Sequence, residues 1–179
     1  MGWLRRLLGP GVPPGYADLA PEENVLAVAE VRDGGHLMAT SLGLWLPSGA
    51  GARRVGWHLI SKATWAGGTL SVIEAAESGS AGDAVLIADQ PTRRFGLARP
   101  GALPRVVHAR ITGSIRSRHH RELPGGGAWF VQRKVPGADG IVLQVRADPG
   151  TDDATVRRLA AEVAARLRQV PADEPEPLD

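Results

Sequence analysis

The chain has 179 residues, 43% of them apolar and 22% charged, which is the composition of an ordinary soluble domain. Its 21 basic and 19 acidic residues leave a formal net charge of only +2. The absence of cysteine excludes disulfides, thiolate catalysis and metal centres built on cysteine ligands. No apolar run approaches the roughly 20 residues of a membrane-spanning helix. We therefore expect a cytoplasmic protein.

Residues 1–20 are predicted to form an N-terminal arm followed by a linker rich in proline and glycine. The arm is amphipathic, because two arginines lie between its apolar residues. We expect weak peripheral membrane contact through four side chains at helical spacing, Trp3, Leu4, Leu7 and Leu8. The alternative is a frayed terminus or an arm folded back on the core, since helices this short are marginal without support.

Short β-strands at regular spacing are predicted for the first half of the chain. They are expected at residues 25–31, 36–40, 44–46, 55–60, 69–73, 84–88 and 94–97. Alternation in the fourth of these strands places Val55, Trp57 and Leu59 on one face. Residues 79–83 are expected to form a flexible loop. Strands of this length and spacing predict a sandwich or a barrel.

The chain has five tryptophans but only two phenylalanines and one tyrosine. Large aromatic residues within strands usually belong to the core, although they can also form an aromatic platform for a ligand. We interpret Trp45, Trp57 and Trp65 as core residues and leave Trp3 and Trp129 open.

The segment over residues 104–115 fits either a helix or a strand. Pro104 suits the first position of a helix, in which Leu103, Val107 and Ile111 would form one apolar stripe. Alternate residues from Val107 to Ile115 also fit a strand. We predict a helix over 104–112, followed by strands over 113–123, 129–135 and 141–145.

A C-terminal helix is predicted beyond Asp152 or Asp153, either of which can cap its first turn. Its apolar residues recur at spacings of three and four and are expected to form one buried stripe. The stripe consists of Val156, Leu159, Ala160, Val163, Leu167 and Val170. Residues 171–179 are acidic and rich in proline, and we expect a disordered tail there.

Residues 36–72 contain HLMATSLGLWLP, then RRVGWHLISKATW and GGTLSV. This stretch resembles the core of bacterial pleckstrin-homology-like (PH-like) domains, in which a hairpin with a threonine turn precedes a strand with aromatic residues and a glycine turn. In that family a final amphipathic helix closes one end of a partly open barrel, and the helix predicted over 156–170 suits that role. The whole chain also resembles an uncharacterised actinobacterial protein family.

The resemblance implies a mostly β fold of the β-rich α+β class. The expected architecture is an antiparallel PH-like partly open barrel or sandwich closed by a C-terminal amphipathic helix. We expect one such domain over residues 21–170. Because this barrel serves lipid, peptide and scaffold functions alike, the resemblance does not specify a ligand.

No sequence motif for catalysis is present: there is no phosphate-binding loop, no serine nucleophile elbow and no paired zinc histidines. We therefore predict no catalytic residue, no metal ligand and no cofactor. Neighbouring His119 and His120 would point to opposite faces of a strand and cannot chelate one metal together. The alternative from another class is a small enzyme whose site is assembled from scattered residues, such as His108, His119, His120 and Asp83.

Positive charge is concentrated between residues 91 and 134, where Glu122 is the only acid. The basic residues there are Arg93, Arg94, Arg99, Arg105, Arg110, Arg116, Arg118, Arg121, Arg133 and Lys134. On a strand, Arg116 and Arg118 would share a face with His120, whereas His119 and Arg121 would share the other. The alternative is a solvated face whose arginine content records codon usage.

The predicted binding residues are Arg116, Arg118, His119, His120, Arg121, Arg133 and Lys134. We expect a non-enzymatic binding or scaffold module that presents this basic face to an acidic protein or to an anionic membrane surface. An RNA-associated factor is a further alternative. It ranks lower because the cluster lacks the interleaved exposed aromatic residues typical of single-strand binding.

Overall fold

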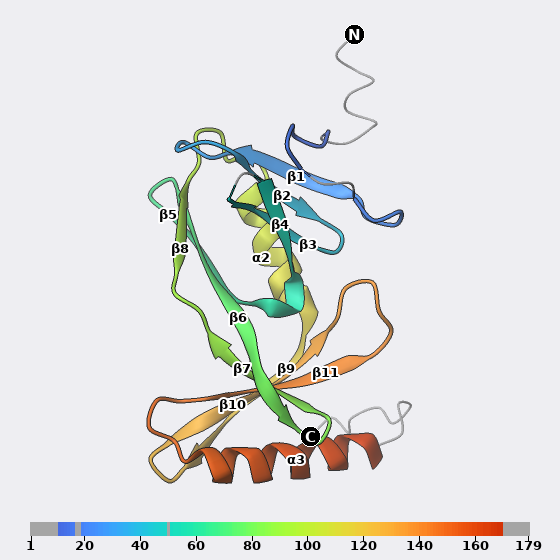
Figure 1. Cartoon of the computed structure of the whole chain (residues 1–179), viewed down its shortest axis with the longest axis vertical. Coiled ribbons are helices and arrows are strands. Elements are labelled where there is room, and N and C mark those ends of the chain that lie inside the picture. Colours follow the sequence, from blue (N-terminus) through green and yellow to red (C-terminus); the bar gives the residue numbers. More distant parts are fainter. Residues whose placement is uncertain (1–10, 17–18, 50, 170–179) are drawn as a thin grey trace, which may run out of the picture. The chain divides into compact units, whose positions relative to one another are not determined.

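The computed structural model describes residues 11–16, 19–49 and 51–169 (Figure 1). The chain is mostly β, with a curled half-barrel sheet and a C-terminal helix, which confirms the predicted β-rich α+β partly open barrel. The predicted membrane-contact residues Trp3, Leu4, Leu7 and Leu8 and the tail at 171–179 lie outside the described residues.

The elements follow one another as β1 (Val25–Glu30), β2 (His36–Thr40), β3 (Gly43–Ser48), β4 (Gly51–Gly56), the 3-10 turn η1 (Trp57–Leu59), β5 (Ile60–Ala66), β6 (Thr69–Ala81), β7 (Ala84–Asp89), β8 (Arg93–Gly96), α2 (Leu103–Ser114), β9 (Ile115–Leu123), β10 (Gly126–Lys134), β11 (Ile141–Ala147) and α3 (Asp153–Gln169). The segment that fitted both a helix and a strand is a helix, and a strand follows it as predicted.

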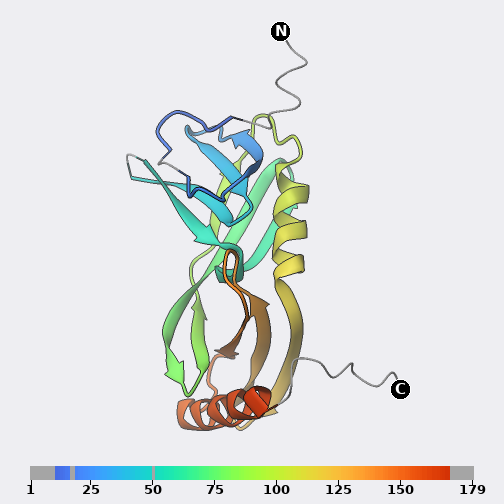
Figure 2. The same ribbon diagram turned by 90° about the vertical axis from the view of Figure 1, so that its right-hand side faces the viewer.

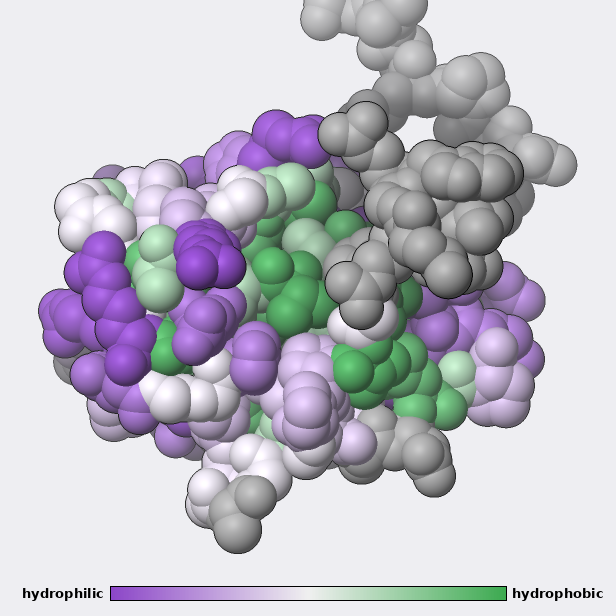
Figure 3. Space-filling model, turned by 90° about the horizontal axis from the view of Figure 1, so that it is seen from above, coloured by the Kyte–Doolittle hydropathy of each residue, from purple (hydrophilic) through white to green (hydrophobic). Residues whose placement is uncertain are grey.

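The chain divides into two compact units. Unit 1 comprises the described residues within 1–76, 89–115 and 134–140. Unit 2 comprises those within 77–88, 116–133 and 141–179. Each unit has its own cluster of buried apolar side chains. The surface seen in Figure 3 carries a band of apolar residues bordered by polar ones.

Unit 1 contains the four-stranded sheet β1-β2-β3-β4, whose neighbours are antiparallel. After η1, strands β5 and β8 both pair with β6, again antiparallel. Helix α2 packs against β1, β2, η1 and β5, as Figure 2 lets the reader follow. It contributes Leu103, Val107 and Ile111 to the core of unit 1. Helix α2 therefore covers the core of unit 1, and the C-terminal helix contributes to the core of unit 2.

Two turns in unit 1 show why the sequence folds this way. Between β5 and β6, Gly67 and Gly68 have φ angles of 56° and 75°. Two consecutive left-handed residues give a hairpin turn whose twist matches that of the strands. Between β2 and β3, the amides of Leu42 and Gly43 each donate a hydrogen bond of 3.2 Å to Thr40 Oγ1. This is the threonine turn on which the family resemblance depends.

The strand predicted over 55–60 is wrong. Strand β4 ends at Gly56, and η1 turns the chain before β5 begins. Val55 and Trp57 are buried as expected, but η1 shifts the alternation, so that Ile60 rather than Leu59 is fully buried. Trp65 was also expected in the core, yet it is 39% exposed because it lies near the end of the β5–β6 hairpin.

The flexible loop expected over 79–83 is also largely wrong. Strand β6 has 13 residues and continues to Ala81, so only the turn between β6 and β7 remains as loop. Strand β3 similarly continues to Ser48, past Pro47, which was expected to end it. In both strands the backbone stays extended through glycine, serine or proline, which are residue types common in turns.

Unit 2 contains the strands β7-β11-β10-β9 in that order, with the end of β6 beside β7. Strands β7 and β11 are parallel, an exception to the antiparallel pattern that the sequence predicted. Helix α3 packs against β11. Its first turn is capped by Asp152, whose Oδ2 accepts a hydrogen bond of 2.8 Å from the Thr155 amide.

The stripe predicted for α3 is only partly correct. The buried residues are Val156, Ala160 and Ala164, at a constant spacing of four. Leu159 and Val163 are half-buried beside them, and Leu167 is 38% exposed. The line of contact therefore follows the small residues, which let the helix approach the sheet closely.

Candidate functional site

The members of the predicted basic cluster belong to both units. Unit 1 holds Arg93, Arg94, Arg99, Arg105, Arg110 and Lys134. Unit 2 holds Arg116, Arg118, Arg121 and Arg133. Each unit therefore has a basic feature of its own.

In unit 2, one face of the β9–β10 hairpin carries a compact polar and aromatic cluster. The guanidinium of Arg118 lies over Trp129, 5.0 Å from the ring centre. The ring of His120 is also 5.0 Å from that of Trp129, and its Nε2 is 2.7 Å from Asp148 Oδ2. The predicted shared face of Arg118 and His120 is thus confirmed by their common contact with one tryptophan.

A glycine makes room for this cluster. A Cβ atom at Gly127 would lie 2.6 Å from two ring atoms of His120, closer than real side chains approach. The Gly127 amide instead donates a hydrogen bond of 2.9 Å to Thr151 Oγ1. The sequence pattern did not place Trp129 or Asp148 in this cluster, because these contacts join residues far apart in the chain.

The other predicted binding residues on β9 are exposed, whereas Arg133, which lies on β10, is buried. His119 and Arg121 are exposed and alternate with His120 along β9. Strand β9 ends the sheet order, so its edge away from β10 pairs with no strand of the described residues. Arg133 is only 4% exposed, and burial lowers its pKa to about 10. It therefore does not belong to the exposed basic face.

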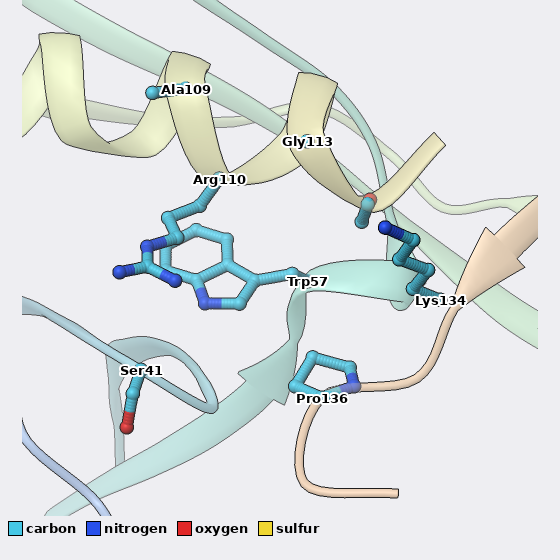
Figure 4. A pocket seen from close by; sticks show the side chains of 8 residues that line it. Ser41, Trp57, Ala109, Arg110, Gly113, Lys134 and Pro136 are labelled. Carbon is cyan, nitrogen blue, oxygen red and sulfur yellow. The ribbon is translucent and has the colours of Figure 1, made fainter. Parts of the chain in front are cut away.

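In unit 1, a cavity of about 460 Å³ lies against the C-terminal half of α2 (Figure 4). Its lining residues are Ser41, Trp57, Ala109, Arg110, Gly113, Ser114, Lys134 and Pro136. They come from the turn after β2, from η1, from α2, and from the end of β10 and the segment that follows it. Arg110 and Lys134 both line the cavity, and Figure 4 shows their side chains on either side of Trp57. The lining contains two cations and no carboxylate.

The wall beneath this cavity is fixed by buried hydrogen bonds. Trp57 is only 2% exposed, and its Nε1 donates a hydrogen bond of 3.0 Å to the Thr40 carbonyl. Ser114 Oγ donates a hydrogen bond of 2.6 Å to the Ile111 carbonyl. A Cβ atom at Gly137 would lie 3.0 Å from Leu42, so the segment after β10 is close to the threonine turn. The cavity therefore has pre-formed walls.

Behind the threonine turn lies a buried carboxylate, that of Glu23. It accepts hydrogen bonds from Thr40 Oγ1 at 2.5 Å and from Trp45 Nε1 at 2.9 Å, and it forms an ion pair with Arg54. Burial acts to raise the pKa of Glu23, but these hydrogen bonds, one from the Ala20 amide and the charge of Arg54 together hold the pKa below its ordinary value. The group is structural, since its oxygens are already occupied.

A second cavity of unit 1, of about 600 Å³, lies between β5 and the start of α2. Its lining residues are Ala63, Thr64, Trp65, Leu70, Pro100, Gly101, Pro104, Arg105 and His108. The exposed Trp65 is part of this lining, which explains how a large aromatic side chain is tolerated outside the core. Most of the surface is apolar, and no charged pair lies within it.

The residues named for the enzymatic alternative do not come together. His108 lines the second cavity of unit 1, whereas His119 and His120 lie on β9 of unit 2. Asp83 pairs with Arg168 at 2.7 Å. Within the described part of the chain, no hydrogen bond or ion pair joins any two of these four residues, and no three potential metal ligands cluster. No helix among the described residues is long and apolar enough to cross a membrane.

Comparison of the chain with family models, with curated proteins and with solved structures found no match. We therefore infer a function from the geometry of the two basic features.

Proposed function

We propose that the protein is a non-enzymatic binding module and that strand β9 of unit 2 binds an acidic, extended segment of a partner protein. One observation carries the proposal: β9 is an edge strand with exposed cationic side chains on both of its faces. Arg118 lies on the face that carries Trp129, and Arg121 lies on the other. The four-stranded sheet of unit 1, its threonine turn and α2 support a PH-like scaffold.

An extended peptide fits this strand better than a flat surface does. The free edge of β9 offers backbone donors and acceptors to a segment that pairs alongside it. Carboxylates on alternate residues of that segment would reach the cations on both faces. A membrane surface would meet one face only. The same charges repel basic strands, so they favour an acidic partner.

The cluster around Trp129 also explains how carboxylates would be held. His120 already contacts the carboxylate of Asp148, which shows that this face accommodates an acidic group. Arg118, placed over the indole ring, has no carboxylate partner among the described residues. An incoming acidic side chain would therefore find a positioned guanidinium and would not need to break an ion pair.

The test uses the full chain and a fluorescently labelled glutamate-rich peptide, with binding followed by anisotropy at low and high salt. We expect binding at low salt that weakens as salt is raised. The double variant Arg118→Gln/Arg121→Gln should weaken binding about tenfold or more, equivalent to roughly 1.4 kcal/mol. Arg94→Gln, at an exposed position of unit 1, removes the same kind of charge and should have little effect.

Two results would contradict the proposal. If Arg94→Gln weakened peptide binding as much as the double variant, the interaction would depend on total charge rather than on β9. If the peptide did not bind at low salt while vesicles containing anionic lipid sedimented with the protein, the partner would be a membrane surface. A gel shift with total RNA under the same conditions tests whether the anionic partner is instead a nucleic acid.

A further inference from the structure

The cavity of unit 1 beside α2 has features that the β9 proposal does not use. From its charge, shape and walls we infer that it binds a small organic anion, meaning a phosphate or carboxylate group attached to an apolar or planar body. All of its lining residues belong to unit 1, and none of them is a residue of β9.

The two cations that line this cavity have no carboxylate beside them. In unit 1, Arg53 and Arg93 pair with Glu74, and Arg54 pairs with Glu23. In contrast, neither cation of the cavity, Arg110 or Lys134, has an ion-pair partner within the described residues. Two cations that line one cavity with no carboxylate beside them form a local positive field, which favours an anion.

The two hydroxyl groups in the cavity lining already form hydrogen bonds within the protein. Ser114 Oγ already donates to a backbone carbonyl, and Ser41 Oγ accepts a hydrogen bond of 3.0 Å from the Asn24 amide. Recognition of a charged group therefore falls to Arg110 and Lys134. The guanidinium can bind two oxygens of a carboxylate or phosphate at once, and the ammonium adds a compact charge.

The size and walls of the cavity suit a small organic molecule. The volume of about 460 Å³ lies within the range of small-molecule sites, roughly 300–1,000 Å³. Gly113 lines the cavity from α2, and a Cβ atom there would meet nothing within 4 Å. Glycine weakens a helix relative to alanine, but here it leaves the space in front of α2 open. Trp57, Ala109 and Pro136 supply apolar walls for the body of the ligand.

Nitrogen-15 NMR of the full chain tests this inference directly. The signals to follow are the Trp57 indole N–H and the Gly113 and Ser114 amides. The probes are phenyl phosphate, benzoate, inorganic phosphate and the neutral benzyl alcohol. We expect saturable shifts with phenyl phosphate, with benzoate or with both, at least tenfold weaker binding of inorganic phosphate and no saturable shift with benzyl alcohol. The first two probes distinguish a phosphate from a carboxylate ligand.

Variants decide whether these residues form the site. Arg110→Gln and Lys134→Gln should each weaken binding of the better probe at least tenfold, and Gly113→Leu should block it by filling the cavity. Arg105→Gln is the matched control, since Arg105 lies on the same helix outside this lining. If Gly113→Leu failed to fold, the two glutamine variants would still decide the matter, because both positions are exposed.

The inference would be overturned if none of the three anionic probes gave a saturable shift at millimolar concentration. It would equally be overturned if Arg105→Gln weakened binding as much as Arg110→Gln, because the effect would then reflect the charge of α2 in general. Peptide binding to β9, measured on the Arg110→Gln variant, should be unchanged, so failure of one proposal does not imply failure of the other.

Discussion

The two units differ in the size of the side chains that form their cores. The largest fully buried side chains, Trp57, Leu37, Met38, Leu44, Leu46, Ile60, Leu70, Leu97, Leu103, Val72 and Val107, all belong to unit 1, and only Val145 belongs to unit 2. The core of unit 2 instead contains Ala81, Ala84, Ala128, Ala160 and Ala164. Because burial free energy scales with apolar area, unit 1 gains more from its core. We infer that unit 2, which carries β9, opens locally before unit 1 does.

The largest expected effect is a truncation in the core of unit 1. Leu44 is fully buried, so Leu44→Ala should lower the free energy of unfolding by about 2–5 kcal/mol. The same truncation at Leu167 of unit 2, which is 38% exposed, should cost no more than about 0.5 kcal/mol. Urea denaturation measures both. Similar losses for the two variants would mean that Leu167 is buried as the sequence pattern predicted.

A substitution in the small-residue core of unit 2 should have an intermediate effect. Ala160 is fully buried in α3, and Ala160→Leu overfills the contact at a cost of about 1–3 kcal/mol. Ala154→Leu makes the same change at an exposed position of α3 and is the control. Hydrogen exchange should show faster exchange in β11 for Ala160→Leu alone. Unchanged exchange would show that α3 does not depend on close approach to the sheet.

The smallest expected effect concerns Glu23 of unit 1. Glu23→Gln keeps the shape of the side chain but removes its charge from the network with Thr40, Trp45 and Arg54. We expect a loss of about 1 kcal/mol at neutral pH. Glu22→Gln, at an exposed neighbouring position, should leave stability unchanged and serves as the control.

The Glu23→Gln variant also tests how the contribution of Glu23 to the unfolding free energy changes with pH. The pKa of Glu23 in the folded protein lies below its ordinary value of 4.5. Its contribution to stability is therefore fully present above pH 4.5 and is lost as the pH falls through the pKa of the folded state. The difference in unfolding free energy between the natural protein and Glu23→Gln should narrow on acidification. A constant difference would mean that the carboxylate is not stabilised by this network.

The sequence predicted most elements of both units, because hydrophobic period and turn residues act locally. Pro104 and the spacing of Val107 and Ile111 favoured α2, and the structure confirms it. The failures have physical reasons. Alternation over 55–60 could not show that η1 would shift the pattern by one residue. Glycine and serine near residue 80 favoured a loop, but pairing with β7 keeps that segment extended.

The candidate sites were less predictable, because they depend on contacts between distant residues. Period-two alternation placed Arg118 and His120 together, but it could not bring Trp129 and Asp148 to them. Arg133 and Lys134 are neighbours in sequence, and yet one is buried while the other is exposed. The cavity beside α2 was not predicted at all, since its residues come from four separate parts of the chain.

Strand β6 begins in unit 1 and ends in unit 2, and the chain alternates between the units until residue 141. Neither unit is therefore encoded by one continuous stretch of sequence. During synthesis, unit 1 lacks residues 134–140 until most of the polypeptide has left the ribosome, so neither half can finish folding early. A protease cut or a premature stop directly after residue 115 would remove segments of both units at once, so the N-terminal fragment would contain neither unit in full.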